Sequence, residues 1–374
     1  MNLLIKKLLK LCFYYFLLTI TLNSFNHVAA QALKYSNEFM SLGVGARALG
    51  MSNAVLSSTN DVTSGYWNPA NLVFITSNLQ VGLMHSEYFA GIAKYDYAAI
   101  AAKIDEKSAL CFSYIRFGID DIPNTIDLVD NQGNIDFTKI SSFSAVDNAF
   151  LFSYARKNKN KKINYGGNVK IIYRHIGDFA KAWGFGLDAG INYNYNNWLF
   201  AITGKDITST FNIWDYDLPQ NMKDVFLITG NDIPTNSTEI TVPKLLAGIS
   251  KNFQLKNNFY FMPEINFDFT FDKKRNVLVK SNLISIDPKV GIEVNYKNII
   301  YYRAGIGNFQ KETNNENKKI TTFQPNMGLG IVIKKSLFID YALTDIGDKS
   351  IALYSNVFSI KININKKSDI KNTQ

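Results

Sequence analysis

The stretch Trp183–Tyr195, with the sequence WGFGLDAGINYNY, decides the fold of this chain. Its odd-numbered positions hold aromatic or aliphatic residues, and its even-numbered positions hold Gly, Asp or Asn. Successive side chains of a β-strand point to opposite faces, so this order predicts a strand with one apolar face and one polar face. The same alternation recurs at 259–269, 290–296 and 323–333. Several of these segments exceed the ~5–6 residues that are usual for strands of soluble sheets.

Fourteen such strands are expected, and the connections between them alternate in length. Tight turns at the periplasmic rim and long loops outside are typical of a transmembrane barrel. Soluble sandwiches and propellers give no reason for loops to segregate by length. The strands are expected at 78–88, 95–104, 108–117, 147–157, 163–174, 182–195, 198–206, 243–252, 258–269, 287–296, 299–309, 322–333, 337–344 and 354–364. The longer loops are expected at 89–94, 118–146, 175–181, 207–242, 270–286, 310–321 and 345–353.

The apolar face of each strand is expected to contact outer-membrane lipid. A closed barrel satisfies every backbone hydrogen bond internally, so its outer face can be apolar while its inner face is polar. Aromatic residues near strand ends, such as Trp183, Tyr195 and Trp198, would then form belts at the membrane surfaces. The core of a soluble β-protein is the alternative explanation for any single aromatic residue. The pattern as a whole predicts an all-β, 14-stranded transmembrane barrel of the outer membrane over 78–364.

The first thirty residues predict export. Three lysines within the first ten residues precede an apolar run over 11–22, and Val28-Ala29-Ala30 follows it. A basic, an apolar and a small-residue region in this order form a secretory signal peptide. The apolar run is shorter than the ~20 residues that a transmembrane helix needs. We therefore expect 1–30 to be a signal peptide.

The composition excludes two classes of protein. Aromatic residues make up 14% of the 374 residues, whereas disordered chains are poor in them. Mean hydropathy is −0.07, which is too low for a helical membrane protein with many spans. The formal net charge is +9, but lysines in loops beside a lipid headgroup surface need no nucleic acid partner.

Residues 31–77 lack the alternation and precede the first strand. We expect them to form a plug inside the lumen, because a barrel this wide would otherwise leave an aqueous channel. The glycines at 43, 45 and 50 do not predict a nucleotide loop, since no strand precedes them and no Lys-Ser/Thr pair follows.

Three motifs of this segment, in order, resemble the N-terminal region of the PorV/PorQ family. They are Lys34-Tyr35-Ser36-Asn37-Glu38-Phe39, the run at 45–51 from Gly45 to Met51, and Trp67-Asn68-Pro69-Ala70, and the resemblance continues at 88–93 and 116–124. Members are outer-membrane barrels related to the FadL long-chain fatty-acid transporters, whose plug also carries Asn-Pro-Ala. The resemblance implies a FadL-like, 14-stranded barrel. It also implies a role in type IX secretion, in which members bind cargo proteins or their carboxy-terminal signals.

The same resemblance makes part of the plug a candidate site, with a structural or ligand-adjacent role. The candidate plug residues are Trp67, Asn68, Pro69, Ala70, Gly45 and Arg47.

One departure from outer-membrane barrels lies at the carboxyl end, where a polar tail over 365–374 follows the last strand in place of a terminal aromatic residue.

No catalytic residue, metal site or cofactor is expected. After removal of the signal peptide, the only histidines of the chain are His85 and His175. Ser86 and Glu87 follow His85 too closely along one strand to act with it as nucleophile and orienting acid. The acid pair Asp120-Asp121 lies in a predicted loop, where a solvated turn is the simpler explanation and a cation site the alternative. We therefore predict a protein that is not an enzyme.

Two functions follow from these features, and a purely structural barrel is a third. The first is secretion or surface attachment, with loops 118–146 and 207–242 binding cargo or other secretion proteins. The second is transport or binding of hydrophobic small molecules such as long-chain fatty acids, with an acyl chain bound in the lumen. The candidate partner-binding residues are Phe211, Ile213, Trp214, Tyr216, Leu218, Asp120 and Asp121.

Overall fold

The computed structural model describes residues 36–129, 132–158, 162–313, 317–346 and 354–365. The expected signal peptide over 1–30 and the tail from 366 onward lie outside the described residues. The plug and the barrel belong to one compact unit.

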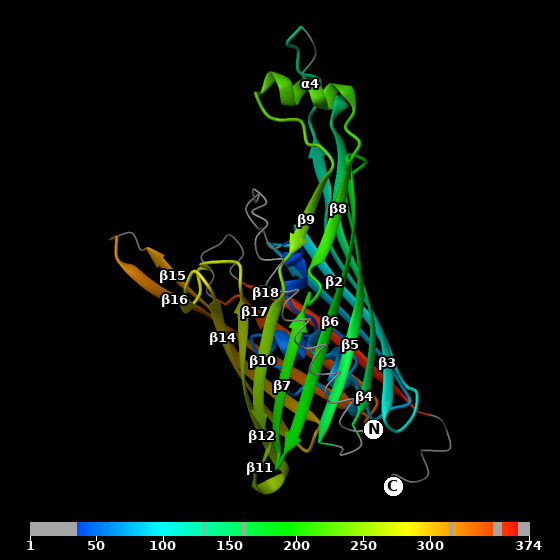
Figure 1. The fold of residues 1–374 in the computed structure, drawn as a ribbon, viewed down its shortest axis with the longest axis vertical. Helices are drawn as coiled ribbons and strands as arrows, with labels where there is room; N and C mark the ends of the chain where they lie inside the picture. Colours follow the sequence, from blue (N-terminus) through cyan, green and yellow to red (C-terminus); the bar gives the residue numbers. More distant parts are fainter. Residues whose placement is uncertain (1–35, 130–131, 159–161, 314–316, 347–353, 366–374) are drawn as a thin grey trace, which may run out of the picture. The chain divides into compact units, whose positions relative to one another are not determined.

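The strands form one closed antiparallel sheet (Figure 1). β1 (Leu79–Tyr88) pairs with β2 (Ala93–Lys103) on one side and with β18 (Ser355–Ile364) on the other, and this closes the barrel. The remaining long strands are β3 (Ser108–Asn124), β4 (Ser141–Lys157), β5 (Ile163–Ile176), β6 (Ala180–Tyr195), β12 (Phe259–Thr270), β14 (Ser285–Tyr296), β15 (Ile300–Thr313), β16 (Lys319–Ile333) and β17 (Leu337–Thr344).

Two barrel strands are interrupted, and each is therefore described by two segments. β7 (Trp198–Lys205) and β8 (Thr210–Tyr216) both pair with β6. β10 (Lys244–Lys251) pairs with β7, and β9 (Ser237–Thr241) pairs with β8. The two-residue segments β11 (Phe253–Gln254) and β13 (Val279–Lys280) lie beside β12 and β14. The described residues thus form a closed barrel of fourteen strands, which confirms the fold that the alternation predicts.

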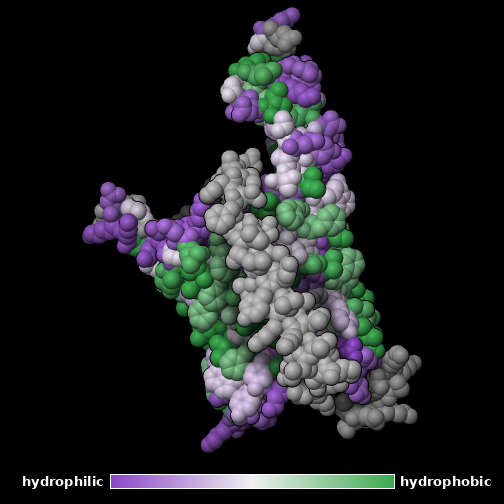
Figure 2. All heavy atoms as spheres, viewed as in Figure 1, coloured by the Kyte–Doolittle hydropathy of each residue, from purple (hydrophilic) through white to green (hydrophobic). Residues whose placement is uncertain are grey.

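Burial follows the alternation along each strand. On β6, Trp183, Phe185 and Ile191 are about half exposed, whereas Asp188 and Asn192 at the alternate positions are buried. Figure 2 shows hydrophobic residues over the flanks of the strands and hydrophilic residues toward both ends. An exposed apolar band on a closed barrel is the surface that hydrocarbon requires. Among the described residues, no helix is long and apolar enough to cross a membrane.

The plug lies inside the barrel and is drawn in blue in Figure 1. Four short helices form it: η2 (Glu38–Ser41), α2 (Ala46–Gly50), α3 (Ser64–Trp67) and η3 (Pro69–Phe74). The main hydrophobic core lies between the plug and the inner wall, where Val44 and Leu72 of the plug pack in one cluster with Ile115 and Leu151 of the wall.

Glycines on the inner face of the wall let the plug backbone approach. A Cβ at Gly166 of β5 would lie 2.6 Å from the carbonyl carbon of Pro69. A Cβ at Gly305 of β15 would lie 2.6 Å from the backbone oxygen of Met51. Real Cβ atoms do not approach backbone so closely, so the glycines that occupy the polar face of the predicted strands mark the path of the plug.

Several predicted loops are shorter than expected, and two of them differ most from the structure. β3 continues to Asn124 and β4 begins at Ser141, so the connection expected over 118–146 covers only 125–140 and contains η4 (Phe137–Lys139). The connection expected over 207–242 contains β8, α4 (Gln220–Ile228) and β9. The extensions of β3 and β4 mix polar and apolar residues, and the register shifts between Ile119 and Ile122, so the alternation there is too short and irregular to mark them in the sequence.

These segments form a projection that we call the extracellular arm: β8, α4, β9 and the described residues of the connection 125–140. Figure 1 shows α4 at its far end. The Asn221 side chain of α4 donates a hydrogen bond to Asp127, with 2.9 Å between Nδ2 and Oδ1. The two longest predicted loops therefore meet outside the barrel. η5 (Lys256–Asn258) lies at the opposite, short-turn end.

Candidate functional site

A chain of ion pairs ties the plug to the barrel wall. Arg47 of α2 places its Nε 2.8 Å from Oε2 of Glu293 on β14, and the same oxygen lies 2.7 Å from Nε of Arg303 on β15. Nη1 of Arg303 lies 2.6 Å from Oδ1 of Asp340 on β17. Burial alone would lower the pKa of Arg47, but the Glu293 carboxylate raises it above its usual value. The guanidinium therefore stays charged and holds α2 against the wall.

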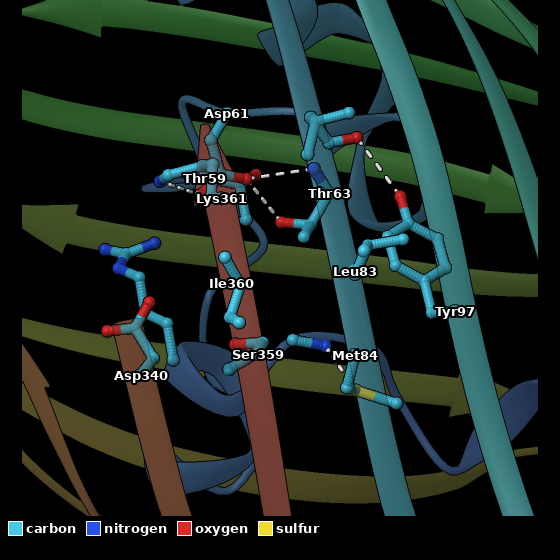
Figure 3. Close-up of a pocket in the computed structure, with 15 residues that line it drawn as sticks. Thr59, Asp61, Thr63, Leu83, Met84, Tyr97, Asp340, Ser359, Ile360 and Lys361 are labelled. Carbon is cyan, nitrogen blue, oxygen red and sulfur yellow. Dashed lines mark hydrogen bonds and ion pairs between the residues drawn. The ribbon is translucent and has the colours of Figure 1, made fainter. Parts of the chain in front are cut away.

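A second ion pair holds the middle of the plug, as Figure 3 shows. Oδ2 of Asp61 lies 2.7 Å from Nζ of Lys361 on β18, and Oδ1 accepts hydrogen bonds from the backbone N–H and the hydroxyl of Thr63. Burial would raise the pKa of Asp61, but Lys361 and Thr63 lower it below its usual value. The cavity beside these groups has a volume of ≈ 30 Å³, which holds about one or two water molecules.

The predicted plug motif makes structural contacts at each position. Trp67 donates its Nε1–H to the carbonyl oxygen of Val44 over 2.9 Å. Asn68 caps η3 by accepting from the N–H of Ala70 over 3.1 Å, and its Nδ2 donates to the carbonyl of Ile191 on β6 over 3.3 Å. Pro69 opens η3, where its missing N–H costs no hydrogen bond. Gly45 precedes α2 with a φ of 88°, a conformation that favours glycine.

A cavity of ≈ 490 Å³ lies between the plug and the strand ends that lead into the longer connections. We call it the upper cavity. Its plug side includes Leu42, Leu49 and Asn53, and its wall includes Tyr88 and Phe89 at the end of β1. The lining thus combines apolar and polar groups, which suits a molecule that carries both.

The wall beside the upper cavity is interrupted between β14 and β15. These strands pair only as far as Val290 and Ile306, although β14 continues along β12 and β15 continues along β16. Above the interruption, the side chain of Asn276 accepts from the N–H of Lys311 over 3.0 Å and donates to its carbonyl over 3.2 Å. We call the interval between these two points the β14–β15 gap. Figure 1 shows β15 and β16 leaving the barrel wall here.

The residues at the β14–β15 gap belong to the upper cavity. Asp287 and Lys289 of β14 and Gly307 and Asn308 of β15 all line it. The cavity therefore reaches the wall at the place where backbone pairing is missing. A lateral path from the membrane or from outside would enter here.

A smaller cavity of ≈ 70 Å³, which we call the inner cavity, adjoins the upper one. Both cavities are lined by Ser41, Asn53 and Lys289. In the inner cavity, Nζ of Lys170 lies 2.8 Å from Oδ1 of Asp188 and also pairs with Asp206. The Lys205 ammonium lies 4.0 Å from the centroid of the Tyr66 ring and 5.6 Å from that of Trp67.

The candidate partner-binding residues fall in different environments. Phe211 and Ile213 of β8 are exposed on the outer face, whereas Trp214 and Leu218 are buried, and Tyr216 packs against Trp214. Asp120 pairs with Arg116 at 3.1 Å, and Asp121 has a φ of 58° at an irregularity between Ile119 and Ile122. Their role in binding stays a prediction.

The sequence did not single out Lys205, Asp287 or Lys289. Each occupies a polar position of an alternating strand, like many lumen residues that only pair with a neighbour. The cavity and the missing strand pairing distinguish these three residues, and both depend on contacts between distant strands. Among the described residues, no group of three or more His, Cys, Asp or Glu could hold a metal ion.

A closed antiparallel barrel of fourteen strands with an apolar outer band and a plugged lumen is an outer-membrane β-barrel. The chain is similar in structure to CymD, a monoaromatic hydrocarbon channel, with a TM-score of 0.55 and a sequence identity of 12%. The alignment covers 87% of this chain and 98% of CymD. A deletion mutant of the TodX monoaromatic hydrocarbon channel has a TM-score of 0.51 and a sequence identity of 12%, and the alignment covers 86% of this chain and 99% of TodX. A FadL homologue of Pseudomonas aeruginosa has a TM-score of 0.48 and a sequence identity of 11%, and the alignment covers 86% of this chain and 98% of that homologue.

The likenesses to CymD and TodX concern the fold alone. A fourteen-stranded barrel with an apolar outer band belongs in the outer membrane, which confirms the predicted location. No family model matches the sequence, and no curated protein sequence matches it. The resemblance to the PorV/PorQ family therefore stays a prediction.

Proposed function

We propose that this protein is an outer-membrane channel that takes up small molecules with an apolar part through the upper cavity. The observation that carries the proposal is the β14–β15 gap, where a cavity of ≈ 490 Å³ reaches an unpaired part of the wall. The channels CymD and TodX, which are named for monoaromatic hydrocarbons, support it through their shared fold. Long-chain fatty acids, which we expected as alternative substrates, belong to the same broad class.

The plug closes the lumen below the upper cavity. Leu56, Leu72 and Ile75 of the plug are at most 1% exposed, so the plug is packed against its surroundings at these positions. Passage to the periplasm then requires the plug to shift, and the ion pairs of Arg47 and Asp61 limit that shift. A closed resting state of this kind keeps the membrane sealed between uptake events.

A bulky side chain at Gly307 tests the proposal. A Cβ at this position would meet Cγ of Lys289 at 3.4 Å and Cβ of Ser52 at 3.5 Å, which are ordinary contacts, so Gly307→Phe should fold and fill the cavity at the gap. Thr321→Phe on the exposed part of β16 is the matched control.

The measurement is uptake of labelled toluene and decanoate by cells that carry only the variant protein. Gly307→Phe should reduce uptake to the level of cells without the protein, while Thr321→Phe should leave it unchanged. Equal uptake by wild type and Gly307→Phe would refute the proposed path, provided that heat-modifiable migration shows a folded barrel.

We also propose type IX secretion or surface attachment as a second function, because the extracellular arm exposes large apolar side chains. Phe137 is 72% exposed, Leu227 of α4 is 63% exposed and Ile228 is 84% exposed. Apolar groups this far from the lipid band are better suited to contact a protein than water. Site-specific crosslinking from Leu227 in cells tests this function. Recovery of secretion components or cargo signals supports it, and recovery of neither would exclude the arm as their binding surface.

A further inference from the structure

We propose that the short-turn end of the barrel binds the headgroups of anionic phospholipids in the periplasmic leaflet of the outer membrane. Three lysines carry the proposal, Lys162, Lys251 and Lys297, and we call them the rim lysines. The uptake path involves the lumen and the opposite end of the barrel, so lipid binding at this rim is a separate function.

The connections at the short-turn end carry charge of one sign. Six connections join the described strands there, and five of them contain seven lysines and neither Asp nor Glu. These five are 158–162, 196–197, 252–258, 297–299 and 334–336, whereas the sixth, 104–107, holds Asp105 and Glu106. The rim is therefore positively charged from β4 round to β17, next to the apolar band.

The loop end of the barrel differs, because its cations pair with carboxylates. Nη2 of Arg116 lies 3.1 Å from Oδ1 of Asp120, and Nζ of Lys181 lies 3.4 Å from Oδ2 of Asp215. None of the rim lysines forms an ion pair with a described residue, and their printed neighbours are aromatic rings. A surface with charge of one sign attracts an anionic partner, so the short-turn end is the one suited to bind anions.

Each rim lysine lies beside an exposed aromatic ring of the outer face. The distances from Nζ to the ring centroid are 5.7 Å for Lys162 and Tyr195, 4.8 Å for Lys251 and Trp198, and 5.1 Å for Lys297 and Tyr296. All three rings lie at strand ends, because Tyr195 ends β6, Trp198 begins β7 and Tyr296 ends β14. Tyr and Trp at such positions lie at the level of the lipid headgroups. The ammonium groups are therefore placed beside the phosphates of that leaflet.

An anionic phospholipid matches both features of this rim. Its phosphate provides the negative charge for the rim lysines, and its acyl chains contact the apolar outer face next to them. Free phosphate would use only the lysines. The rim lysines also belong to three separated parts of the rim, near β5, β10 and β14, so they contact different lipid molecules.

Lipid retention by the purified full-length protein tests the proposal. The protein in detergent is mixed with equal amounts of dioleoyl phosphatidylglycerol, which is anionic, and dioleoyl phosphatidylcholine, which is zwitterionic and has the same acyl chains. Native mass spectrometry counts the lipids that stay bound. Wild type should retain phosphatidylglycerol over phosphatidylcholine by at least about fivefold, which is the contribution of one lysine near an anionic lipid surface.

Two triple variants with the same change of charge show which end of the barrel is responsible. The rim variant combines Lys162→Gln, Lys251→Gln and Lys297→Gln, and it should retain the two lipids about equally. The control variant combines Lys139→Gln, Lys181→Gln and Lys274→Gln, which are exposed lysines at the loop end, and it should keep the wild-type ratio. Heat-modifiable migration should show a folded barrel for both variants, because every replaced side chain lies at the surface.

Equal retention of both lipids by wild type would overturn the proposal. A rim variant that keeps the wild-type ratio would also overturn it and would favour an acidic protein as the partner of these lysines. Loss of the ratio in the control variant would show that net charge alone explains the preference.

Sodium phosphate separates a lipid site from a site for free phosphate. It should displace no more phosphatidylglycerol than sodium chloride of the same ionic strength, because both salts screen exposed charges equally. Greater displacement by phosphate would show that the rim binds the phosphate ion itself, and the assignment to lipid would be wrong.

Discussion

Replacing Glu293 with Gln should loosen the plug, because this carboxylate joins the plug to the wall. Its Oε2 lies 2.8 Å from Nε of Arg47 and 2.7 Å from Nε of Arg303. Gln keeps the size of the side chain but removes the charge. The two guanidinium groups would then face each other across a neutral amide, and Arg303 would keep Asp340 as an acidic partner.

The size of the effect follows from burial. The side chains of Arg47, Glu293 and Arg303 are 16%, 8% and 3% exposed, so water screens the lost attraction only weakly. Removal of one partner from a buried ion pair costs about 3–5 kcal/mol. We expect the free energy of unfolding of Glu293→Gln to fall by about that amount, measured by urea titration in detergent micelles with the slope of the transition unchanged. Hydrogen exchange at the amides of α2 should also become faster, because this helix loses its anchor.

An exposed ion pair provides the control. Nζ of Lys181 lies 3.4 Å from Oδ2 of Asp215, and the two side chains are 60% and 53% exposed. Lys181→Gln should cost less than about 1 kcal/mol. If Glu293→Gln cost no more than this control and left exchange in α2 unchanged, apolar packing alone would hold the plug, and the reasoning from the ion-pair chain would be refuted.

Three further predictions concern the plug and the gap. The pKa of Asp61 is lowered in the folded state, so its carboxylate contributes stability that is complete above about pH 4 and is lost as the pH falls further. The difference in free energy of unfolding between wild type and Asp61→Asn should therefore shrink on titration from pH 6 to pH 3. Gly166→Ala should destabilise the barrel by about 1–3 kcal/mol because its Cβ would meet plug backbone, and Gly167→Ala should cost less in the same urea titration because its nearest contact is 3.2 Å away. Asn276→Ala removes both hydrogen bonds to the Lys311 backbone, so hydrogen exchange at that amide should become faster without a change in overall fold.

The sequence predicts the barrel well because the membrane acts on every strand in the same way. Each strand needs an apolar outer face, and this demand gives β6 its strict alternation. The plug is predicted by the opposite feature, a long segment before the first strand without alternation. Strand ends above the apolar band are poorly predicted, as β3 and β4 show, because each of their faces mixes polar and apolar residues there.

The candidate site is much less visible in the sequence, since it depends on partners that are far apart along the chain. Arg47 and Glu293 are separated by 246 positions, and no local pattern joins them. The β14–β15 gap is a place where two strands do not pair. Both strands show the usual alternation up to that point, so the sequence does not reveal the missing pairing. Lys205 and Asp287 look like any other polar residue of the lumen face until their neighbours are known.

The charges of the lumen become informative once their pairs are assigned. Mixed signs on the inner face argue against a strongly ion-selective pore, and most of these charges are now explained by the plug or by one another. Arg47 and Asp61 bind the plug to Glu293 and Lys361, and Lys170 and Lys289 pair with aspartates of the wall. Glu264 of β12 is fully buried and forms no ion pair with a described residue, but its Oε1 accepts from the N–H of Ser57 over 2.7 Å and from its hydroxyl over 2.9 Å. A buried carboxylate is costly unless donors satisfy it, so the charges of this lumen are retained where they hold the plug.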